Sequence, residues 1–163
     1  MIPLYCENDQ WHALFTRRAE RVDAHSGQVS FPGGLIETDD SGPEQAALRE
    51  AQEEIGLHPG DVDILGRLNP TRTITRFLVT PIVGTIPWPY DFSLNRSEVA
   101  RVFGVPIPWL ADPDNLEMRK YKLTSFGPSF DVHFFKPYDN ELIWGATGRI
   151  VVNLLNELRQ IQL

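Results

Sequence analysis

The segment from residue 43 to residue 56 constrains the fold more than any other stretch, because it predicts an amphipathic helix that carries a row of carboxylates. Its apolar residues recur at spacings of three and four, namely Ala47, Leu48, Ala51 and Ile55. Ser41 and Glu44 have the spacing of a capping box, and Gly56 can adopt the left-handed conformation that ends a helix. We therefore expect a helix over residues 43–55 with one face in a hydrophobic core.

The other face of this helix is acidic. Glu50, Glu53 and Glu54 stand at positions i, i+3 and i+4, so their carboxylates project from one side of the helix. Like charges at this spacing destabilise a helix, and Mg²⁺ or Mn²⁺ removes that cost because both ions prefer oxygen ligands. The alternative is a solvated acidic face. The sequence around the helix distinguishes a metal-binding face from a solvated one.

The rest of the chain predicts a sheet and a second helix. Strands are expected over residues 2–5 and 11–16 as a hairpin, then over 28–31, 62–68, 74–83, 85–86 and 101–105, with a second hairpin over 118–126 and 130–135. A short turn or helix follows residue 105. One buried stripe predicts the C-terminal helix, formed by Ile150, Val151, Leu154, Leu155 and Leu158. Mixed strands covered by two helices predict a single layered domain of the α/β or α+β class over residues 1–163.

Composition and charge narrow the classes of function. Apolar residues make up 42% and charged residues 23% of the 163 residues, as in ordinary globular domains. The formal charge of −7 opposes a nucleic-acid partner, and the absence of any run of 18 apolar residues argues against a membrane span. The lone Cys6 favours a reducing compartment. We expect a cytoplasmic protein with a small-molecule partner, and leave open whether it forms a homodimer.

Together, the helix and the glycines before it resemble a known signature. The pattern Arg49-Glu50-x-x-Glu53-Glu54-x-Gly56-Leu57, following Gly34, resembles the Nudix box. The resemblance implies a Nudix-type α/β/α sandwich with a mixed β-sheet. It also implies Mg²⁺- or Mn²⁺-dependent hydrolysis of a diphosphate linkage in a nucleoside diphosphate derivative.

Roles for individual residues follow from this resemblance. Glu50, Glu53 and Glu54 would be the metal ligands, and Arg49 would orient the central carboxylate through an ion pair. Water would be activated by one of these glutamates, with Glu53 as the candidate, or by an outlying glutamate such as Glu98, for which a helix cap or a surface position is the alternative.

One departure from the usual box points to a particular branch of the family. Gly34 is followed by five residues, Asp40 and eight more before Arg49, so the box is one residue longer than usual and Ser41 stands where a glutamate is expected. This expansion, and the upstream motifs over residues 14–19 and 27–34, resemble the coenzyme A diphosphatases. The expected substrate is coenzyme A or an acyl-CoA, split into 3′,5′-ADP and 4′-phosphopantetheine or its acyl form. Residues expected to contact the substrate are Arg18, Gln28, Gly33 and Gly34.

Two alternatives remain open. Asp23 stands where that branch carries a basic residue, which favours a different nucleoside diphosphate, such as a dinucleotide or a sugar nucleotide. A non-catalytic nucleotide-binding module is the other alternative, although it would have no need for three mutually repelling glutamates. His25 could contact a phosphate or simply be solvated. Aromatic residues that could stack on a base are more often core residues; they are Phe31, Trp109, Phe130 and Trp144.

Overall fold

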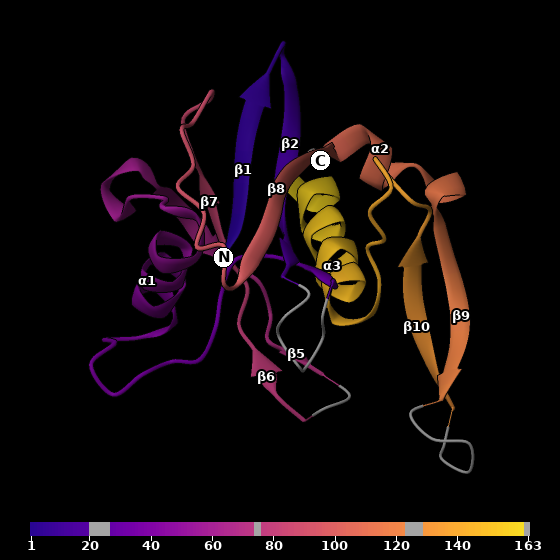
Figure 1. Ribbon diagram of the computed structural model, residues 1–163. Coiled ribbons are helices and arrows are strands. Elements are labelled where there is room, and N and C mark those ends of the chain that lie inside the picture. Colours follow the sequence, from indigo (N-terminus) through magenta and orange to yellow (C-terminus); the bar gives the residue numbers. More distant parts are fainter. Residues whose placement is uncertain (20–26, 74–75, 123–128, 162–163) are drawn as a thin grey trace.

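A mixed β-sheet forms the centre of the molecule (Figure 1). The computed structural model describes residues 1–19, 27–73, 76–122 and 129–161. Within these ranges the strands are β1 (Ile2–Glu7), β2 (Gln10–Arg18), β3 (Val29–Ser30), β4 (Asp63–Arg67), β5 (Thr71–Arg72), β6 (Leu78–Val79), β7 (Ile82–Thr85), β8 (Val99–Pro106), β9 (Leu116–Lys122) and β10 (Ser129–Phe135). The helices are α1 (Pro43–Ile55), α2 (Ile107–Ala111) and α3 (Gly145–Ile161), with single 3₁₀ turns η1 (Pro59–Asp61) and η2 (Pro113–Asn115).

Strand β2 is the hub of the main sheet. Its partners β1 and β3 pair with successive parts of one edge, and β8 pairs antiparallel along the other. On its far side β1 pairs in parallel with β7, and β7 pairs antiparallel with β4, which ends the sheet. Two small sheets, β5–β6 and β9–β10, complete the described strands. The sheet is therefore mixed, as predicted.

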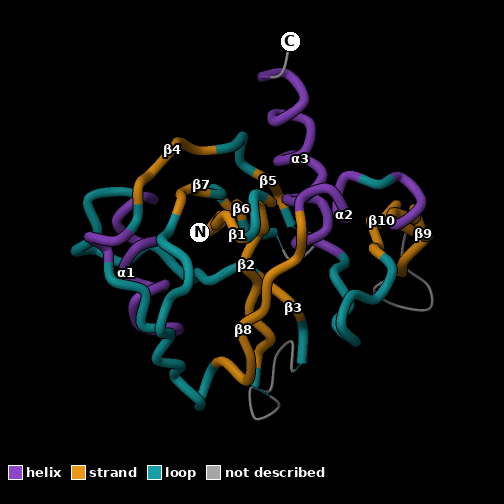
Figure 2. The backbone as a smooth tube through the Cα atoms, turned by 90° about the horizontal axis from the view of Figure 1, so that it is seen from above, coloured by secondary structure: helices purple, strands orange, loops and turns teal. Residues whose placement is uncertain are grey.

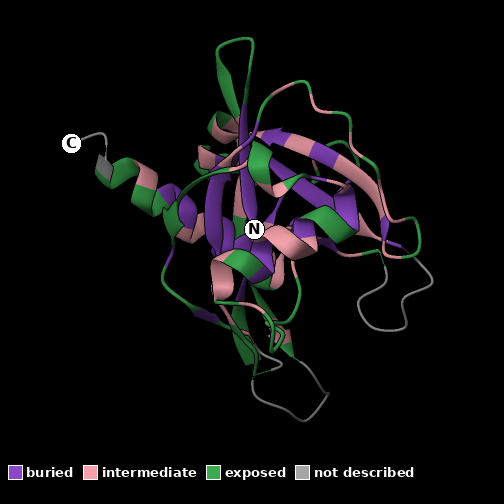
Figure 3. Cartoon of the chain, turned by 90° about the vertical axis from the view of Figure 1, so that its left-hand side faces the viewer, coloured by how far each residue is buried: buried purple, intermediate pink, exposed green. Residues whose placement is uncertain are grey.

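Two hydrophobic cores lie on opposite faces of this sheet, each covered by one helix (Figure 2). Side chains alternate between the faces along each strand. In β1, Leu4 belongs to the core under α3 and Tyr5 to the core under α1, and in β2 the same division separates Phe15 from Leu14. Figure 3 shows the buried segments concentrated in the strands and on the inward sides of the helices. This arrangement confirms the predicted α/β/α sandwich.

Helix α1 spans the predicted residues 43–55, but it begins differently from the prediction. The helix N-cap is Gly42, and no side chain caps it, so the capping box expected of Ser41 and Glu44 is wrong. Instead, the Ser41 N–H donates to Gln45 Oε1 over 2.6 Å. Pro43 occupies the first turn, where its missing N–H leaves one donor fewer to satisfy. At the other end Gly56 adopts the left-handed conformation, φ 70°, as predicted.

The continuous strand predicted over residues 74–83 is also wrong. Two strands, β6 and β7, are separated at Thr80 and Pro81. Proline has no N–H to offer a sheet partner, so it interrupts the ladder. Residues 74–75 lie outside the described part of the chain.

The other predicted elements are confirmed to within a few residues, except that residues 85–86 form no separate strand, because Thr85 is the last residue of β7. The β1–β2 hairpin turns through Asn8 and Asp9, both with positive φ, which these two residue types tolerate better than most. Strand β8 is longer than predicted, and α2 is the expected short helix after residue 105. Strands β9 and β10 form the second hairpin, whose predicted residues 123–126 lie outside the described ranges. None of the helices in the described ranges has both the length and the apolar character needed to cross a bilayer.

Candidate active site

The loop after β3 that contains Gly33 and Gly34, called the glycine loop below, packs directly against the acidic face of α1. The Gly33 N–H donates to Glu54 Oε2 over 3.1 Å. A Cβ placed on Gly34 would lie 2.3 Å from Glu50 Oε1, so only a residue without a side chain fits while Glu50 keeps this position. The predicted residues Gly33 and Gly34 are thus brought against two of the three predicted ligands, Glu50 and Glu54.

Arg49 links the carboxylates around it. Its Nη1 lies 3.1 Å from Glu50 Oε1 and 3.2 Å from Glu53 Oε2, while Nη2 donates to the Leu35 carbonyl over 2.9 Å. The contact with Glu53 is the predicted ion pair to the central carboxylate. The same guanidinium also holds the loop before α1 against the helix.

Asp40, rather than Ser41, completes this arrangement. Its Oδ1 accepts from Arg49 Nε over 3.2 Å and its Oδ2 from Arg49 Nη2 over 3.1 Å, a two-pronged contact. The Arg49 guanidinium lowers the pKa of Asp40, helped by the Glu37 N–H that also donates to Oδ2. These hydrogen bonds, that to Asp40 first, raise the pKa of Arg49. In this longer box the carboxylate that contacts Arg49 therefore comes from Asp40, one residue before the position of Ser41 where the usual box has a glutamate.

Glu54 is the buried member of the acidic face, with 6% of its surface exposed. Burial raises the pKa of its carboxyl to about 7; the Gly33 N–H and the Arg18 charge act in the opposite direction, and the charges of Glu50 and Glu98 raise it further. Because the charges of Arg18 and Glu98 both act on the Glu54 carboxyl, these two predicted residues lie near Glu54. Glu53, by contrast, has 56% of its side chain exposed at the rim.

Glu98 is held by a residue that the sequence did not reveal. Asn95 Nδ2 donates to Glu98 Oε1 over 2.9 Å, and the Asn95 N–H donates to the Glu54 carbonyl over 2.9 Å. Asn95 Oδ1 also accepts from the N–H and hydroxyl of Ser97, a turn motif typical of Asn two residues before its partner. The pattern Asn95-x-Ser97-Glu98 was the available signal.

Arg18 reaches the site from the end of β2. The pairing register between β2 and β8 shifts between Arg17 and Arg18, and the Arg18 N–H donates to the Gln28 carbonyl over 3.0 Å. In the described part of the chain, the buried Arg18 Nε has no hydrogen-bond partner. Arg18 therefore has donor capacity left for an anion. Asp23 and His25 lie outside the described residues.

The aromatic candidates have structural surroundings. Phe31 stacks on Phe15 with ring centroids 4.6 Å apart, and Trp109 contacts Tyr138 edge-on at 4.9 Å. Trp144 stacks on Phe134 at 5.2 Å, and Phe130 lies on the β9–β10 hairpin, 37% exposed. The contacts of Phe31, Trp109 and Trp144 agree with the expectation that these aromatic residues pack, whereas the exposed Phe130 is not a core residue.

The three glutamates offer a donor set that suits a hard divalent cation. One oxygen of each is engaged by Arg49 or Gly33, which leaves Glu50 Oε2, Glu53 Oε1 and Glu54 Oε1 with no hydrogen bond to the described residues. In those same ranges, no three His, Cys, Asp or Glu side chains already enclose a cation position. Mg²⁺ usually retains several waters and takes only one or two carboxylates directly, so an open donor set fits it.

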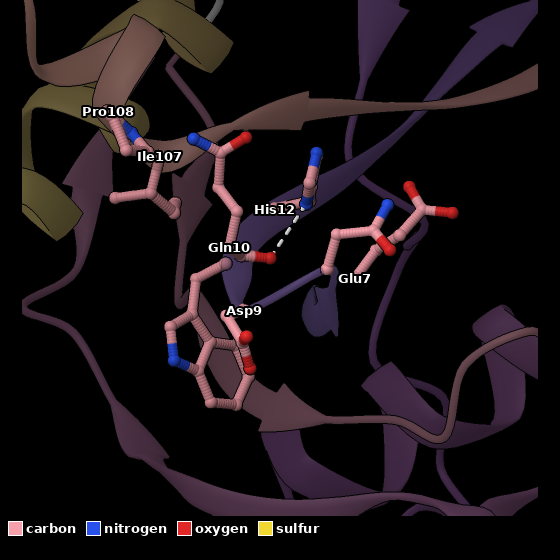
Figure 4. Close-up of a pocket in the computed structure, with 8 residues that line it drawn as sticks. Glu7, Asp9, Gln10, His12, Ile107 and Pro108 are labelled. Carbon is pink, nitrogen blue, oxygen red and sulfur yellow. Dashed lines mark hydrogen bonds between the residues drawn. The ribbon is translucent and has the colours of Figure 1, made fainter.

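A wide hollow of about 590 Å³ lies elsewhere, at the tip of the β1–β2 hairpin (Figure 4). It is lined by Glu7, Asn8, Asp9, Gln10, Trp11, His12, Ile107 and Pro108. None of these is a predicted site residue. The predicted site residues lie instead between α1, the glycine loop and Arg18, and this region is the candidate active site.

Comparisons with known proteins agree with this geometry. The NUDIX domain family matches residues 1–125. Uncharacterized Nudix hydrolases NudL from Yersinia pestis and Yersinia pseudotuberculosis are 34% identical to the chain, over 97% of it and 77% of their own length.

Solved structures agree in fold. An Enterococcus faecalis MutT/nudix family protein matches 98% of the chain and 61% of its own, with a TM-score of 0.59 at 15% identity. The Nudix hydrolase RenU from M. smegmatis matches 68% of the chain and 70% of its own length, with a TM-score of 0.57 at 22% identity. At these identities the likeness concerns the fold alone. Through the family match and its 34% identical relatives, the chain belongs to the Nudix family and is a Nudix hydrolase.

Proposed function

We propose that this Nudix hydrolase cleaves the diphosphate of coenzyme A or an acyl-CoA, giving 3′,5′-ADP and 4′-phosphopantetheine or its acyl form. One observation carries the proposal: both parts of the upstream motif converge on Glu54. Gly33 donates its N–H to this carboxylate, and the charge of Arg18 acts on it from the end of β2. The similarity to the NudL proteins extends over 97% of the chain.

Mg²⁺ or Mn²⁺ would be held by Glu50, Glu53 and Glu54. Such a cation, when bound, polarises phosphoryl oxygens and lowers the pKa of a coordinated water. Arg49 fixes Glu50 and Glu53 through its hydrogen bonds, and Gly33 fixes Glu54. Arg18, whose Nε has no hydrogen-bond partner among the described residues, would neutralise charge on the substrate diphosphate.

The bond changes require a water and a proton acceptor. The water oxygen attacks one phosphorus in line, the bridging P–O bond breaks, and the departing phosphate carries the bridging oxygen. The water proton passes to a carboxylate, for which Glu98 and Glu53 are the candidates. Asn95 holds the Glu98 carboxylate in one orientation, as a positioned base requires.

Cleavage of a substrate panel tests this proposal. The purified full chain is incubated with Mg²⁺ or Mn²⁺ and with coenzyme A, an acyl-CoA, a dinucleotide or a sugar nucleotide, and the products are identified by mass. We expect 3′,5′-ADP from the first two. Preference for a compound without the pantetheine arm would replace this substrate with the dinucleotide or sugar-nucleotide alternative. Absence of any cleavage would favour a non-catalytic binding module.

The variant Glu53→Gln tests the role of the rim carboxylate. Glu53 is largely exposed, so the substitution should leave the fold intact while it removes the charge needed for metal binding or proton transfer. We expect kcat to fall roughly 100- to 10,000-fold. The exposed Glu157→Gln on α3 is the matched control and should retain full activity. An unchanged rate in Glu53→Gln would refute its assigned role.

A further inference from the structure

A small cavity of about 50 Å³ lies where β5, β10 and the first turn of α3 meet. Figure 1 shows the beginning of α3 between the β5–β6 hairpin and β10. The cavity is lined by Arg72, Thr73, Asp131, Val132, His133, Gly145, Ala146 and Arg149. A water molecule occupies about 30 Å³ in the liquid, so this space suits a group of a few atoms rather than a whole nucleotide.

The charge of this cavity is positive, in a chain whose formal charge is −7. Arg72 and Arg149 both line it, and neither forms an ion pair with a described residue. Asp131 is a lining residue as well, but its Oδ1 lies 2.7 Å from Lys120 Nζ on the neighbouring strand. Burial, and then the charge of Arg149, lower the pKa of His133. An anion would relieve this concentration of positive charge.

The first turn of α3, whose residues Gly145, Ala146 and Arg149 line the cavity, also contains N–H groups without an acceptor among the described residues. The Trp144 carbonyl already accepts the Gly148 N–H, whereas the N–H groups of Ala146 and Thr147 have no acceptor among the described residues. The first turn contains no acidic residue, and the Thr147 hydroxyl donates to the Val29 carbonyl over 3.0 Å instead of capping the helix. Free N–H groups at a helix start favour anions.

Close packing of α3 on β10 makes this arrangement possible. A Cβ on Gly148 would lie 3.0 Å from the His133 carbonyl oxygen and 3.3 Å from the His133 Cβ. The absent side chain lets the helix approach the strand, which places Arg149 beside His133.

The cavity lies near the candidate active site along the chain. Thr147 contacts Val29, and Gly33, only four residues further on, binds Glu54. Four residues span at most about 14 Å. A substrate whose diphosphate lies at the glycine loop could therefore place a second group at the start of α3.

We propose that the cavity between Arg72, Arg149 and the start of α3 binds a phosphate monoester of the substrate, separate from the diphosphate that is cleaved. This rests on the proposed function, since it makes the enzyme selective for diphosphates that carry such a group. Coenzyme A has one on its ribose, whereas dephospho-coenzyme A, dinucleotides without an extra phosphate and sugar nucleotides do not.

Kinetics with a matched pair of substrates tests the selectivity. Coenzyme A and dephospho-coenzyme A differ by this phosphate alone. For Arg72→Ala and Arg149→Ala we expect KM for coenzyme A to rise roughly 10- to 100-fold with little change in kcat, and KM for dephospho-coenzyme A to stay constant. Arg159→Ala, two to three turns further along α3, is the control and should behave as the parent protein. Equal losses with both substrates, or no loss with either, would overturn the proposal.

A binding measurement decides the question without turnover. The metal-free full chain is titrated with 3′,5′-ADP and with 5′-AMP while the amide signals of Ala146 and Thr147 and the imidazole signals of His133 are followed by NMR. We expect saturable shifts and a raised His133 pKa with 3′,5′-ADP, and both effects lost in the Arg72→Ala/Arg149→Ala variant. Identical responses to the two nucleotides would exclude a monoester site. If no compound of the panel is cleaved, the proposed function fails, but this titration still tests the cavity.

Discussion

Glu54 is the residue at which burial and charge conflict most strongly. It is enclosed by α1 and the glycine loop, and the carboxylates of Glu50 and Glu98 act on it, so its folded-state pKa is about 7 against an ordinary value of 4.5. A group with a raised pKa binds its proton more tightly in the folded state than in the unfolded state. Its contribution to stability is complete below pH 4.5 and is lost as the pH rises through about 7.

This sign gives a stability prediction for the metal-free protein. In Glu54→Gln the side chain stays neutral and nearly isosteric, so its stability should not follow this titration. Between about pH 5 and about pH 8 the parent protein should lose about 2 to 3 kcal/mol of unfolding free energy relative to the variant. Urea unfolding in the presence of a chelator measures this difference. Parallel profiles for the two proteins would contradict it, and the exposed Glu157→Gln should follow the parent.

At this scale the sequence predicted which residues meet but not all of their partners. The spacing of Glu50, Glu53 and Glu54 was enough to place them on one side of α1, because helical periodicity is local. It could not say whether Asp40 or Ser41 faces Arg49, since that depends on the path of a loop. Nor could it find Arg72 and Arg149 as neighbours, because residues 77 positions apart are brought together only by the packing of α3.

At the scale of elements, the end of α1 shows how one glycine serves two purposes. Gly56 has φ 70°, and a Cβ there would lie 2.8 Å from the Ser93 Cβ and 3.0 Å from the Ser93 backbone. The Ser93 N–H donates to the Ile55 carbonyl over 3.1 Å, so the loop that carries Asn95 and Glu98 is attached to the helix terminus. Gly56 therefore both ends α1 and leaves room for the loop at Ser93 to pack against the helix terminus.

The variant Gly56→Ala should therefore be destabilised by both strain and collision. Left-handed strain alone costs about 1 to 2 kcal/mol, and displacement of backbone adds to it, so we expect about 2 to 4 kcal/mol from urea unfolding. Gly27→Ala separates the two effects, because Gly27 has φ 69° and nothing within 4 Å of its added Cβ. A loss in Gly56→Ala no larger than in Gly27→Ala would show that the contact with Ser93 is unimportant.

Local patterns predicted most elements and failed where local signals compete. Helix α1, α3 and the two hairpins have clear periodicity or turn residues and were found. Pro81 was passed over because apolar residues on both sides, from Leu78 to Val83, suggested one strand. The missing N–H of proline outweighs such apolar continuity at a strand break.

For the whole molecule, the two cores share the strands that separate them. Strand β1 contributes Leu4 to one core and Tyr5 to the other, and β2 does the same with Phe15 and Leu14. Neither core can lose its strands without exposing the other. We therefore propose that residues 1–163 behave as one cooperative domain.

Equilibrium unfolding checks this prediction. Trp88 packs against the core under α1 and Trp109 against the core under α3, so Trp88→Phe and Trp109→Phe each remove the tryptophan packed against one core, while Trp11 and Trp144 remain in both variants. We expect fluorescence in each variant to report the same urea midpoint as far-UV circular dichroism of that variant. Two separated midpoints within a variant would indicate that the halves unfold independently.

The parallel pairing of β1 with β7 affects the order in which parts of the protein fold during synthesis. Ile2 pairs with Val83, and the glycine loop and α1 lie between them in the sequence. Local hairpins such as β1–β2 form early, whereas contacts between distant residues must wait for loop closure. A chain still growing on the ribosome therefore contains Glu50, Glu53 and Glu54 well before β7, Asn95 and Glu98 are available to enclose them. We therefore expect hydrolytic activity only after the segment through β8, which pairs with β2, has emerged from the ribosome.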